Sequence, residues 1–139
     1  IYWELEILIM SDKISYSIEY DFHASKQMLF QYLSTPSGLG EWFADNVNSR
    51  GESFTFIWDD SEEYAKILKK KNNELVRFQW DTDAEEGNSY YFEFKIQVDD
   101  LTNDVSLIVT DFAEEDELEE SKMLWDNLIS TLKQTLGSS

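Results

Sequence analysis

The sequence contains no cysteine and only one histidine and one proline in its 139 residues. Without cysteine the chain can form no disulfide, no thiolate nucleophile and no cysteine-based zinc site, which suits a reducing, cytoplasmic setting. The single histidine, His23, excludes a metal centre built on several histidines and leaves a general base without a natural partner. We therefore expect no metal and no cofactor, and we interpret His23 as a surface or turn residue.

Basic residues and long apolar runs are also scarce. Eleven Lys and Arg stand against 29 Asp and Glu, which gives a formal net charge of −18. The electrostatic field of this negative charge repels phosphate backbones and anionic lipid surfaces, so nucleic acid and membrane surfaces are poor partners. No stretch approaches the roughly 18 apolar residues of a membrane span, and we expect no membrane insertion. The charge remains compatible with a basic protein surface or with a cationic or neutral small molecule.

Large apolar side chains, in contrast, are abundant. Hydrophobic residues make up 42% of the sequence and aromatic residues 15%, with 5 Trp, 7 Tyr and 9 Phe. That is too much apolar surface for a disordered acidic chain. A chain of this length buries roughly 68% of the surface that it exposes when unfolded, so we expect one domain with one core.

The first residues allow two interpretations. Met10 and the polar residues after it are typical of a natural chain start, which would make residues 1–9 an added extension. The alternative is an edge strand, because apolar and acidic residues alternate before Met10. No basic residue and no cleavage site accompany this segment, so we do not expect it to be a signal peptide. We assign residues 1–10 to an extension or edge strand, 11–136 to the domain and 137–139 to a tail.

A strand and two short helices are predicted next. Apolar and polar residues alternate from Ile14 to Phe22, which indicates a half-buried strand. Residues 25–34 change to helical spacing, with Ser25 as the expected N-cap. Pro36 then marks the start of a second short helix.

Five further strands are predicted in a meander, because apolar residues recur at alternate positions in short runs between polar turns. Their centres are residues 54–58, 64–68, 76–80, 92–98 and 105–109. The connections are expected to be hairpin turns at residues 59–62, 70–73 and 99–104 and a longer acidic loop at 81–88.

One long amphipathic helix is predicted at the end of the chain. Its apolar residues recur mostly at intervals of three and four: Leu118, Trp125, Leu128, Ile129, Leu132 and Leu136. Asp116 and Glu119 resemble a capping box, and Gly137 is a fitting stop. The elements together predict an α+β fold in which a curved antiparallel sheet wraps around one long C-terminal helix.

Two stretches of the sequence carry family-specific detail. In residues 20–36 a strand gives way to a helix and a Thr-Pro break, and the pair Trp42 and Phe43 follows. In residues 123–133 a Trp near the start of the helix precedes spaced leucines. These stretches and the order of elements resemble the START-like helix-grip (SRPBCC, Bet v-like) superfamily, which includes START lipid-transfer domains, Bet v allergens and polyketide cyclases.

Within that superfamily the chain looks most like the activators of the heat-shock chaperone ATPase, the AHSA-like group. The resemblance covers residues 11–136 at the level of element order. The seven acidic residues between Asp111 and Glu120 exceed what we expect of the group. A chaperone-binding surface is therefore not carried over to this sequence.

The resemblance implies a space between the curved sheet and the C-terminal helix, which in many members holds a lipid, a hormone or another apolar ligand. The residues expected around this space are Trp42, Phe43, Phe54, Phe56, Trp58, Phe78, Trp80, Phe92, Phe94, Trp125 and Leu128. The same rings can equally fill the interior and leave no room. The sequence leaves an open cavity and a filled core as alternatives.

Candidates for chemistry are weaker. An enzyme of the cyclase or aromatase kind needs a polar residue that faces the cavity. The loose candidates are Tyr16, Tyr20, Tyr64, Tyr90 and Arg77. Their spacing identifies no reaction, and the acidic residues between Asp111 and Glu120 lack the glycine and spacing of an EF-hand loop. We expect no catalytic residue, and we interpret the acidic run as a solvated helix entrance.

The leading hypothesis is a non-enzymatic START-like domain that binds a small hydrophobic ligand in an internal cavity, a protein partner, or both. The first alternative is an acidic regulatory module with a filled core, similar to the chaperone-ATPase activators, that meets a basic partner surface. The second is a polyketide cyclase- or aromatase-like enzyme. A monomer and a homodimer are equally compatible with the sequence, and neither a ligand nor a partner can be named from it.

Overall fold

The computed structural model describes residues 12–137, so the extension or edge strand expected for residues 1–10 lies outside the described residues. Within the described range the strands are β1 (Ile14–Phe22), β2 (Asn46–Arg50), β3 (Ser53–Trp58), β4 (Ser61–Lys71), β5 (Leu75–Trp80), β6 (Phe92–Val98) and β7 (Val105–Ala113). The helices are α2 (Lys26–Ser34), α3 (Pro36–Leu39), α4 (Asp81–Glu85), a 3₁₀ turn η1 (Glu115–Glu117) and α5 (Leu118–Thr135).

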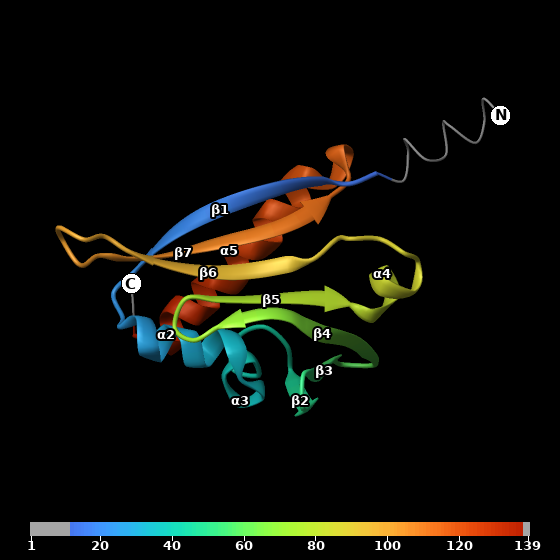
Figure 1. Cartoon of the computed structure of the whole chain (residues 1–139), viewed down its shortest axis with the longest axis horizontal. Helices are drawn as coiled ribbons and strands as arrows, with labels where there is room; N and C mark the ends of the chain where they lie inside the picture. Colours follow the sequence, from blue (N-terminus) through green and yellow to red (C-terminus); the bar gives the residue numbers. More distant parts are fainter. Residues whose placement is uncertain (1–11, 138–139) are drawn as a thin grey trace.

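The described strands form one antiparallel sheet in the order β1-β7-β6-β5-β4-β3-β2. The long helix α5 crosses behind the sheet in Figure 1, and the short helices α2 and α3 lie at the lower left of the view. The helix α2 contacts the central strands β5 and β6, and α3 contacts the edge strand β2. This is the curved sheet around a C-terminal helix that the sequence predicted, with two short helices after the first strand. The α+β helix-grip prediction is confirmed.

Strand positions follow the apolar alternation wherever one face is buried. The strands β1, β3, β5 and β6 lie within one residue of their predicted ranges. The strand β2 was not predicted, because Val47 is its one buried residue and a strand at the sheet edge needs little apolar sequence. The strand β4 is longer than predicted, because both of its faces are largely polar. Lys70 and Lys71 therefore lie in β4, and the hairpin turn predicted at residues 70–73 begins two residues later, at residue 72.

Helix ends follow the sequence only in part. The predicted N-cap of α2 is confirmed, since the Met28 N–H donates to Ser25 Oγ over 3.1 Å. Gly137 has a φ of +71° directly after α5, as expected for a helix stop. The predicted capping box of Asp116 is wrong, because η1 occupies that segment and α5 starts without a side-chain cap. The acidic segment expected to be a loop contains α4.

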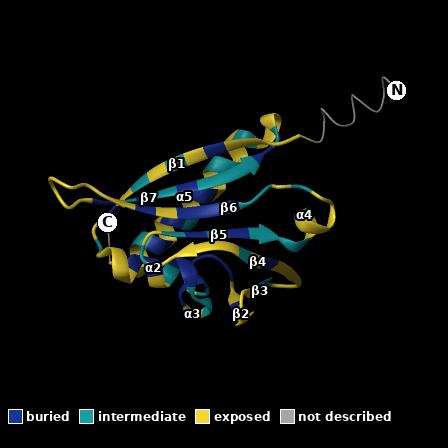
Figure 2. Ribbon diagram, in the orientation of Figure 1, coloured by how far each residue is buried: buried dark blue, intermediate teal, exposed yellow. Residues whose placement is uncertain are grey.

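The core lies between the sheet and the helices. Buried residues recur along β5, β6 and β7, as the dark segments of Figure 2 show. The apolar ones form one cluster with buried apolar residues of α2 and α5. The largest fully buried side chains are Phe56, Phe78, Phe92, Phe94, Leu29, Leu33, Leu39, Leu107, Ile129, Leu132, Val76 and Val109. Each contributes on the order of 1.5–3 kcal/mol through burial, so this contact zone stabilises the whole arrangement. No helix in residues 12–137 is long and apolar enough to cross a membrane.

Candidate functional site

A pocket of about 290 Å³ opens between the sheet and α5. We call it the aromatic pocket. Its lining residues are Phe43, Trp58, Trp80, Phe92, Asp111, Ser121, Leu124, Trp125 and Leu128. They come from β3, β5, β6, β7 and α5 and from the turn after α3, so tertiary structure brings together residues that are distant in the sequence.

Strand direction explains why the wall is aromatic. Antiparallel neighbours run in opposite directions, so the ends of β3 and β5 and the start of β6 meet at one end of the sheet, the end next to α4 in Figure 1. The residues at those positions are Trp58, Trp80 and Phe92. Their ring centroids are 6.4 Å apart for Trp58 and Trp80 and 5.0 Å apart for Trp80 and Phe92. The result is a continuous aromatic surface.

Phe43 extends this surface toward α5. Its ring stacks on Phe92 at 5.6 Å and on Trp125 at 5.9 Å between centroids. The Trp58 Nε1–H donates to the Phe43 carbonyl oxygen over 3.1 Å, which holds the Trp58 ring against the turn that carries Phe43. Trp58 and Trp80 stay half-buried, whereas Phe43 and Phe92 are buried. The exposed part of the aromatic surface therefore faces the pocket opening.

The helix α5 supplies the opposite wall. Ser121, Leu124, Trp125 and Leu128 follow one another at intervals of three, one and three residues, which places them along one side of a helix. Trp125 is buried, and Leu124 keeps 59% of its surface exposed at the pocket rim. The same side of α5 therefore contributes Trp125 to the core and Leu124 to the rim of the pocket.

Asp111 is the one charged residue among the described residues of the wall. Its Oδ2 accepts from the Trp125 Nε1–H over 2.9 Å, and its Oδ1 accepts from the Phe112 backbone N–H over 2.7 Å. No lysine or arginine of the described residues pairs with it. Burial raises the pKa of the Asp111 carboxyl above its ordinary value, and the negative charge of Asp83 adds to the rise. The Trp125 and Phe112 hydrogen bonds and the positive charge of Lys13 act to lower that pKa.

Two tyrosines of β1 form hydrogen bonds to α5, and one of them lies beside Asp111. Tyr16 is the register partner of Asp111, and its hydroxyl hydrogen-bonds to the Ser121 hydroxyl of the pocket wall. Burial raises the pKa of Tyr16, and the negative charge of Asp111 adds to the rise. The Tyr20 hydroxyl donates to Asp126 Oδ1 over 2.7 Å, outside the pocket, and burial raises its pKa as well. Both phenols are held by partners on α5.

The residues predicted around the cavity separate into two groups. The pocket wall contains Phe43, Trp58, Trp80, Phe92, Trp125 and Leu128. The core contains Trp42, Phe54, Phe56, Phe78 and Phe94, each at most 5% exposed. The interior is thus filled along most of the sheet and open at one end.

Three wall residues were missed by sequence reasoning, namely Asp111, Ser121 and Leu124. A signal for Asp111 was present, because it continues the inward alternation of Val105, Leu107 and Val109 along β7. The predicted strand ended at Val109, which left Asp111 grouped with the acidic run. No comparable signal marks Ser121 or Leu124.

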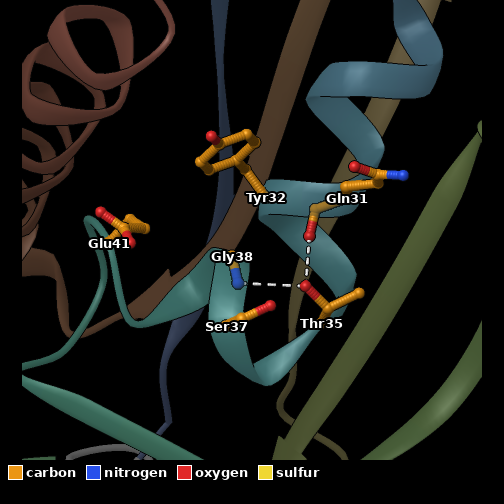
Figure 3. Close-up of a pocket in the computed structure, with 6 residues that line it drawn as sticks. All are labelled: Gln31, Tyr32, Thr35, Ser37, Gly38 and Glu41. Carbon is orange, nitrogen blue, oxygen red and sulfur yellow. Dashed lines mark hydrogen bonds between the residues drawn. The ribbon is translucent and has the colours of Figure 1, made fainter.

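A second hollow, of about 420 Å³, lies where α2 meets α3 (Figure 3). Thr35 Oγ1 donates to the Gln31 carbonyl oxygen over 2.7 Å and accepts from the Gly38 N–H over 3.0 Å. A Cβ on Gly38 would lie 2.2 Å from the Gln31 carbonyl oxygen, so only glycine fits this junction. Because its central polar groups cap the two helices, we interpret this hollow as a structural junction.

The remaining polar candidates do not line the aromatic pocket. Arg77 pairs with Glu93 at 2.7 Å and lies over the Tyr91 ring. The Tyr64 hydroxyl donates to Glu62, and the Tyr90 hydroxyl accepts from the Lys13 backbone N–H. His23 is exposed directly after β1, as expected.

The acidic run before α5 is mostly solvent-exposed. Carboxylates of Glu114, Asp116 and Glu117 lie within 4.8 Å of one another around η1. Glu114 is partly buried and the other two are exposed. This arrangement agrees with the interpretation of a solvent-exposed segment at the start of the C-terminal helix. Exposed carboxylates alone do not define a metal site.

Comparison with known proteins gives a consistent result. A family model described as a START-like superfamily domain matches residues 10–138. The solution NMR structure of BfR322 from Bacteroides fragilis is 39% identical, with a TM-score of 0.65, and the match covers 88% of this chain and 90% of that one. No curated protein matches the sequence.

More distant structures share the fold. The Aha1 dimer of Colwellia psychrerythraea is 19% identical with a TM-score of 0.74, over 88% of this chain and 96% of that one. CalU16 of Micromonospora echinospora is 16% identical with a TM-score of 0.69, over 89% of this chain and 76% of that one. At these identities the likeness concerns the fold alone.

Proposed function

The chain belongs to the START-like superfamily, and from that premise we propose that it binds a small hydrophobic ligand in the aromatic pocket without catalysing a reaction. The observation that carries this proposal is a hollow of about 290 Å³ whose wall is formed mainly by five aromatic rings. Small-molecule sites typically measure about 300–1,000 Å³ and are lined by apolar residues with a few polar groups. The aromatic pocket lies just below that range, which favours a ligand of one or two rings.

Apolar side chains that remain partly exposed to water around the pocket support the proposal. Trp58 and Trp80 are half-buried, and Leu124 is 59% exposed at the rim. A ligand that covers these side chains removes their apolar surface from water, which contributes about 25 cal/mol for each Å². The rings are already held in place by mutual contacts, so little ordering is needed on binding.

The contacts of the polar wall residues support binding without chemistry. The Ser121 hydroxyl is hydrogen-bonded to Tyr16, and both Asp111 oxygens accept hydrogen bonds from the protein. Because burial raises the pKa of Tyr16, its phenol holds its proton more tightly than a free phenol does. The loose enzyme candidates Arg77 and Tyr64 are paired elsewhere.

The regulatory alternative has weaker support. Acidic residues gather before α5, and Met123 is 64% exposed on that helix. These features fit an interaction with a basic protein surface, but they do not define a binding site for a particular partner. We therefore place ligand binding first.

A blocked pocket tests the proposal. We expect the neutral dye prodan to bind saturably, with a blue-shifted emission, and to compete with the natural ligand. Leu124→Trp places a large ring at the rim and should weaken dye binding by about tenfold or more, since it fills space that the dye needs. Met123→Trp is the matched control, because Met123 is equally exposed on α5 but does not line the pocket.

Equal weakening by both substitutions, or no saturable dye binding at all, would contradict the proposal. Native mass spectrometry with organic extraction then identifies any ligand that is retained from the cell. Incubation of that ligand with the protein should return it unchanged, and a modified product would overturn the non-enzymatic part of the proposal.

A further inference from the structure

We propose that the ligand of the aromatic pocket is an organic cation, with an ammonium group attached to an apolar body of about one or two rings. This inference rests on the proposed function and adds the chemical class of the ligand. It is carried by the juxtaposition of an aromatic wall with a carboxylate that forms no ion pair among the described residues.

The carboxylate of Asp111 is the first observation. It lies on the pocket wall, and its two hydrogen bonds come from the neutral N–H groups of Trp125 and Phe112. A carboxylate offers about four lone-pair positions, so two accepted bonds leave it with capacity for more. Buried charges are normally paired, yet the described residues place no lysine or arginine within ion-pair distance of Asp111. Lys13, in the adjoining hollow, attracts the carboxylate but forms no ion pair with it. A cationic ligand would supply the missing partner.

The aromatic wall is the second observation. Ring contacts run from Phe43 to Trp58, to Trp80, to Phe92, to Trp125 and back to Phe43, with centroid distances between 5.0 and 6.4 Å. The faces of such rings carry partial negative charge and attract cations, tryptophan most strongly. A group of aromatic rings beside a carboxylate is therefore complementary to an alkylammonium group.

Charges around the pocket form the third observation. The neighbouring hollow that shares Phe43, Trp58 and Leu128 contains Glu41 and Asp45 and no basic residue among its described lining. The hollow on the other side, which shares Ser121 and Leu124, contains Glu117 and Glu120 against Lys13. The surroundings are net negative on both sides and favour the approach of a cation.

The same charges disfavour an anionic ligand. A fatty acid or another carboxylate bound here would place its charge near Asp111 with no described cation on the wall to compensate for it. Like charges in a partly buried site repel strongly, because the surrounding dielectric is low. The inference thus separates this pocket from one that holds an acidic lipid.

Three probes with one shared body test the inference on the unmodified protein: naphthylmethyl trimethylammonium, naphthylmethanol and naphthoate. Calorimetric titration should show the cation binding about tenfold or more tightly than the neutral alcohol, and the anion binding most weakly. Equal affinities, or tightest binding of the anion, would overturn the inference.

A matched pair of variants assigns the effect to one carboxylate. Asp111→Asn should reduce the affinity for the cation by about tenfold and leave that for the alcohol within about twofold. Asp126→Asn removes the same charge from the exposed side of α5, outside the pocket, and should change neither affinity by more than about twofold. A similar loss in both variants would show that net charge, and not Asp111, selects the ligand.

The outcomes separate the two proposals. If the alcohol binds as well as the cation and Asp111→Asn has no effect, ligand binding stands and the cation inference fails. If none of the three probes binds, the proposed function fails as well. Where Asp111→Asn does not fold, as judged by circular dichroism, the ranking of the three probes on the unmodified protein decides the question.

Discussion

Asp111 combines a structural and an electrostatic role at one position. It sits inward on β7, where apolar residues precede it, and its carboxylate accepts the indole N–H of Trp125. This hydrogen bond ties the sheet to α5 and satisfies a donor that burial would otherwise leave unpaired. The cost is a desolvated carboxylate, which explains the direction of its pKa change.

The titration of Asp111 gives the first prediction. Burial raises the pKa of Asp111, whereas backbone N–H groups of Thr102 and Leu101 lower the pKa of Asp99 in an exposed turn. Carbon-detected NMR of the side-chain carboxyls should therefore show Asp111 titrating at a clearly higher pH than Asp99. The reverse order would contradict the burial of Asp111.

The sign of its effect on stability follows from linkage. Because the folded-state pKa of Asp111 lies above the unfolded value, its contribution to stability is fully present below the unfolded pKa and declines as pH rises through the folded pKa. The Tm of Asp111→Asn relative to the unmodified protein should accordingly shift in favour of the variant as pH rises from about 3 to about 7. A difference that stays constant over this range would show that the carboxylate carries no desolvation cost.

Gly38 shows how a single residue depends on tertiary contacts. Its sequence context, between Ser37 and Leu39, suggests a turn. The structure places it inside α3 against the backbone of Gln31 and Tyr32 in α2, where any Cβ would collide. The close approach of these two helices sets the position of the turn that carries Phe43 into the pocket.

At the scale of elements, α5 has a double function. Trp125, Ile129 and Leu132 form its buried stripe, at intervals of four and three residues. Leu124 and Leu128 flank this stripe on the side of the pocket. The helix therefore determines core packing and pocket width together, and a shift of α5 would change both.

This arrangement predicts different costs for two truncations on α5. Leu132 is fully buried, so Leu132→Ala should lower the free energy of unfolding by about 2–5 kcal/mol, through lost burial and the cavity left behind. Met123 is 64% exposed, and Met123→Ala should change it by less than about 0.5 kcal/mol. Urea denaturation with linear extrapolation measures both. Similar costs for the two variants would mean that α5 does not pack as described.

At the scale of the whole molecule, negative charge is largely uncompensated. The described residues contain three ion pairs, Lys66–Asp81, Lys71–Glu74 and Arg77–Glu93. Lys71–Glu74 joins two exposed side chains and Lys66–Asp81 an exposed and a partly buried one, and pairs at the surface contribute little. With a formal net charge of −18, the compact state experiences self-repulsion that the expanded state relieves.

Salt should therefore stabilise the fold. Raising NaCl from about 0.01 M to about 1 M shortens the screening length from about 30 Å to about 3 Å, and the Tm at pH 7 should rise as repulsion is screened. Differential scanning calorimetry measures this change. KCl should give the same curve at equal ionic strength, since screening does not depend on the identity of the monovalent cation. A Tm that is flat or falling in both salts would contradict the prediction.

The sequence by itself determined the order of the main elements, the fold class and the charge of the molecule, although β2, α4 and η1 were not predicted. Period-two alternation in β1 and β6 and the spaced apolar residues of α5 are local signals, because each reports which side of its own element is buried. Where one strand lacked a buried face, as in β2 and β4, the local signal was absent and the prediction failed or fell short.

Only the tertiary structure decided which aromatic residues fill the core and which surround a pocket. Phe78 and Trp80 share one face of β5, and the apolar alternation of the sequence does not distinguish them. In the structure Phe78 is buried, whereas Trp80 lines the pocket opening. The difference depends on where each strand ends relative to α5, and on a hydrogen bond between Asp111 and Trp125 that no local pattern encodes. Pocket shape is a property of the packed assembly of elements, whereas secondary structure is largely a property of each segment.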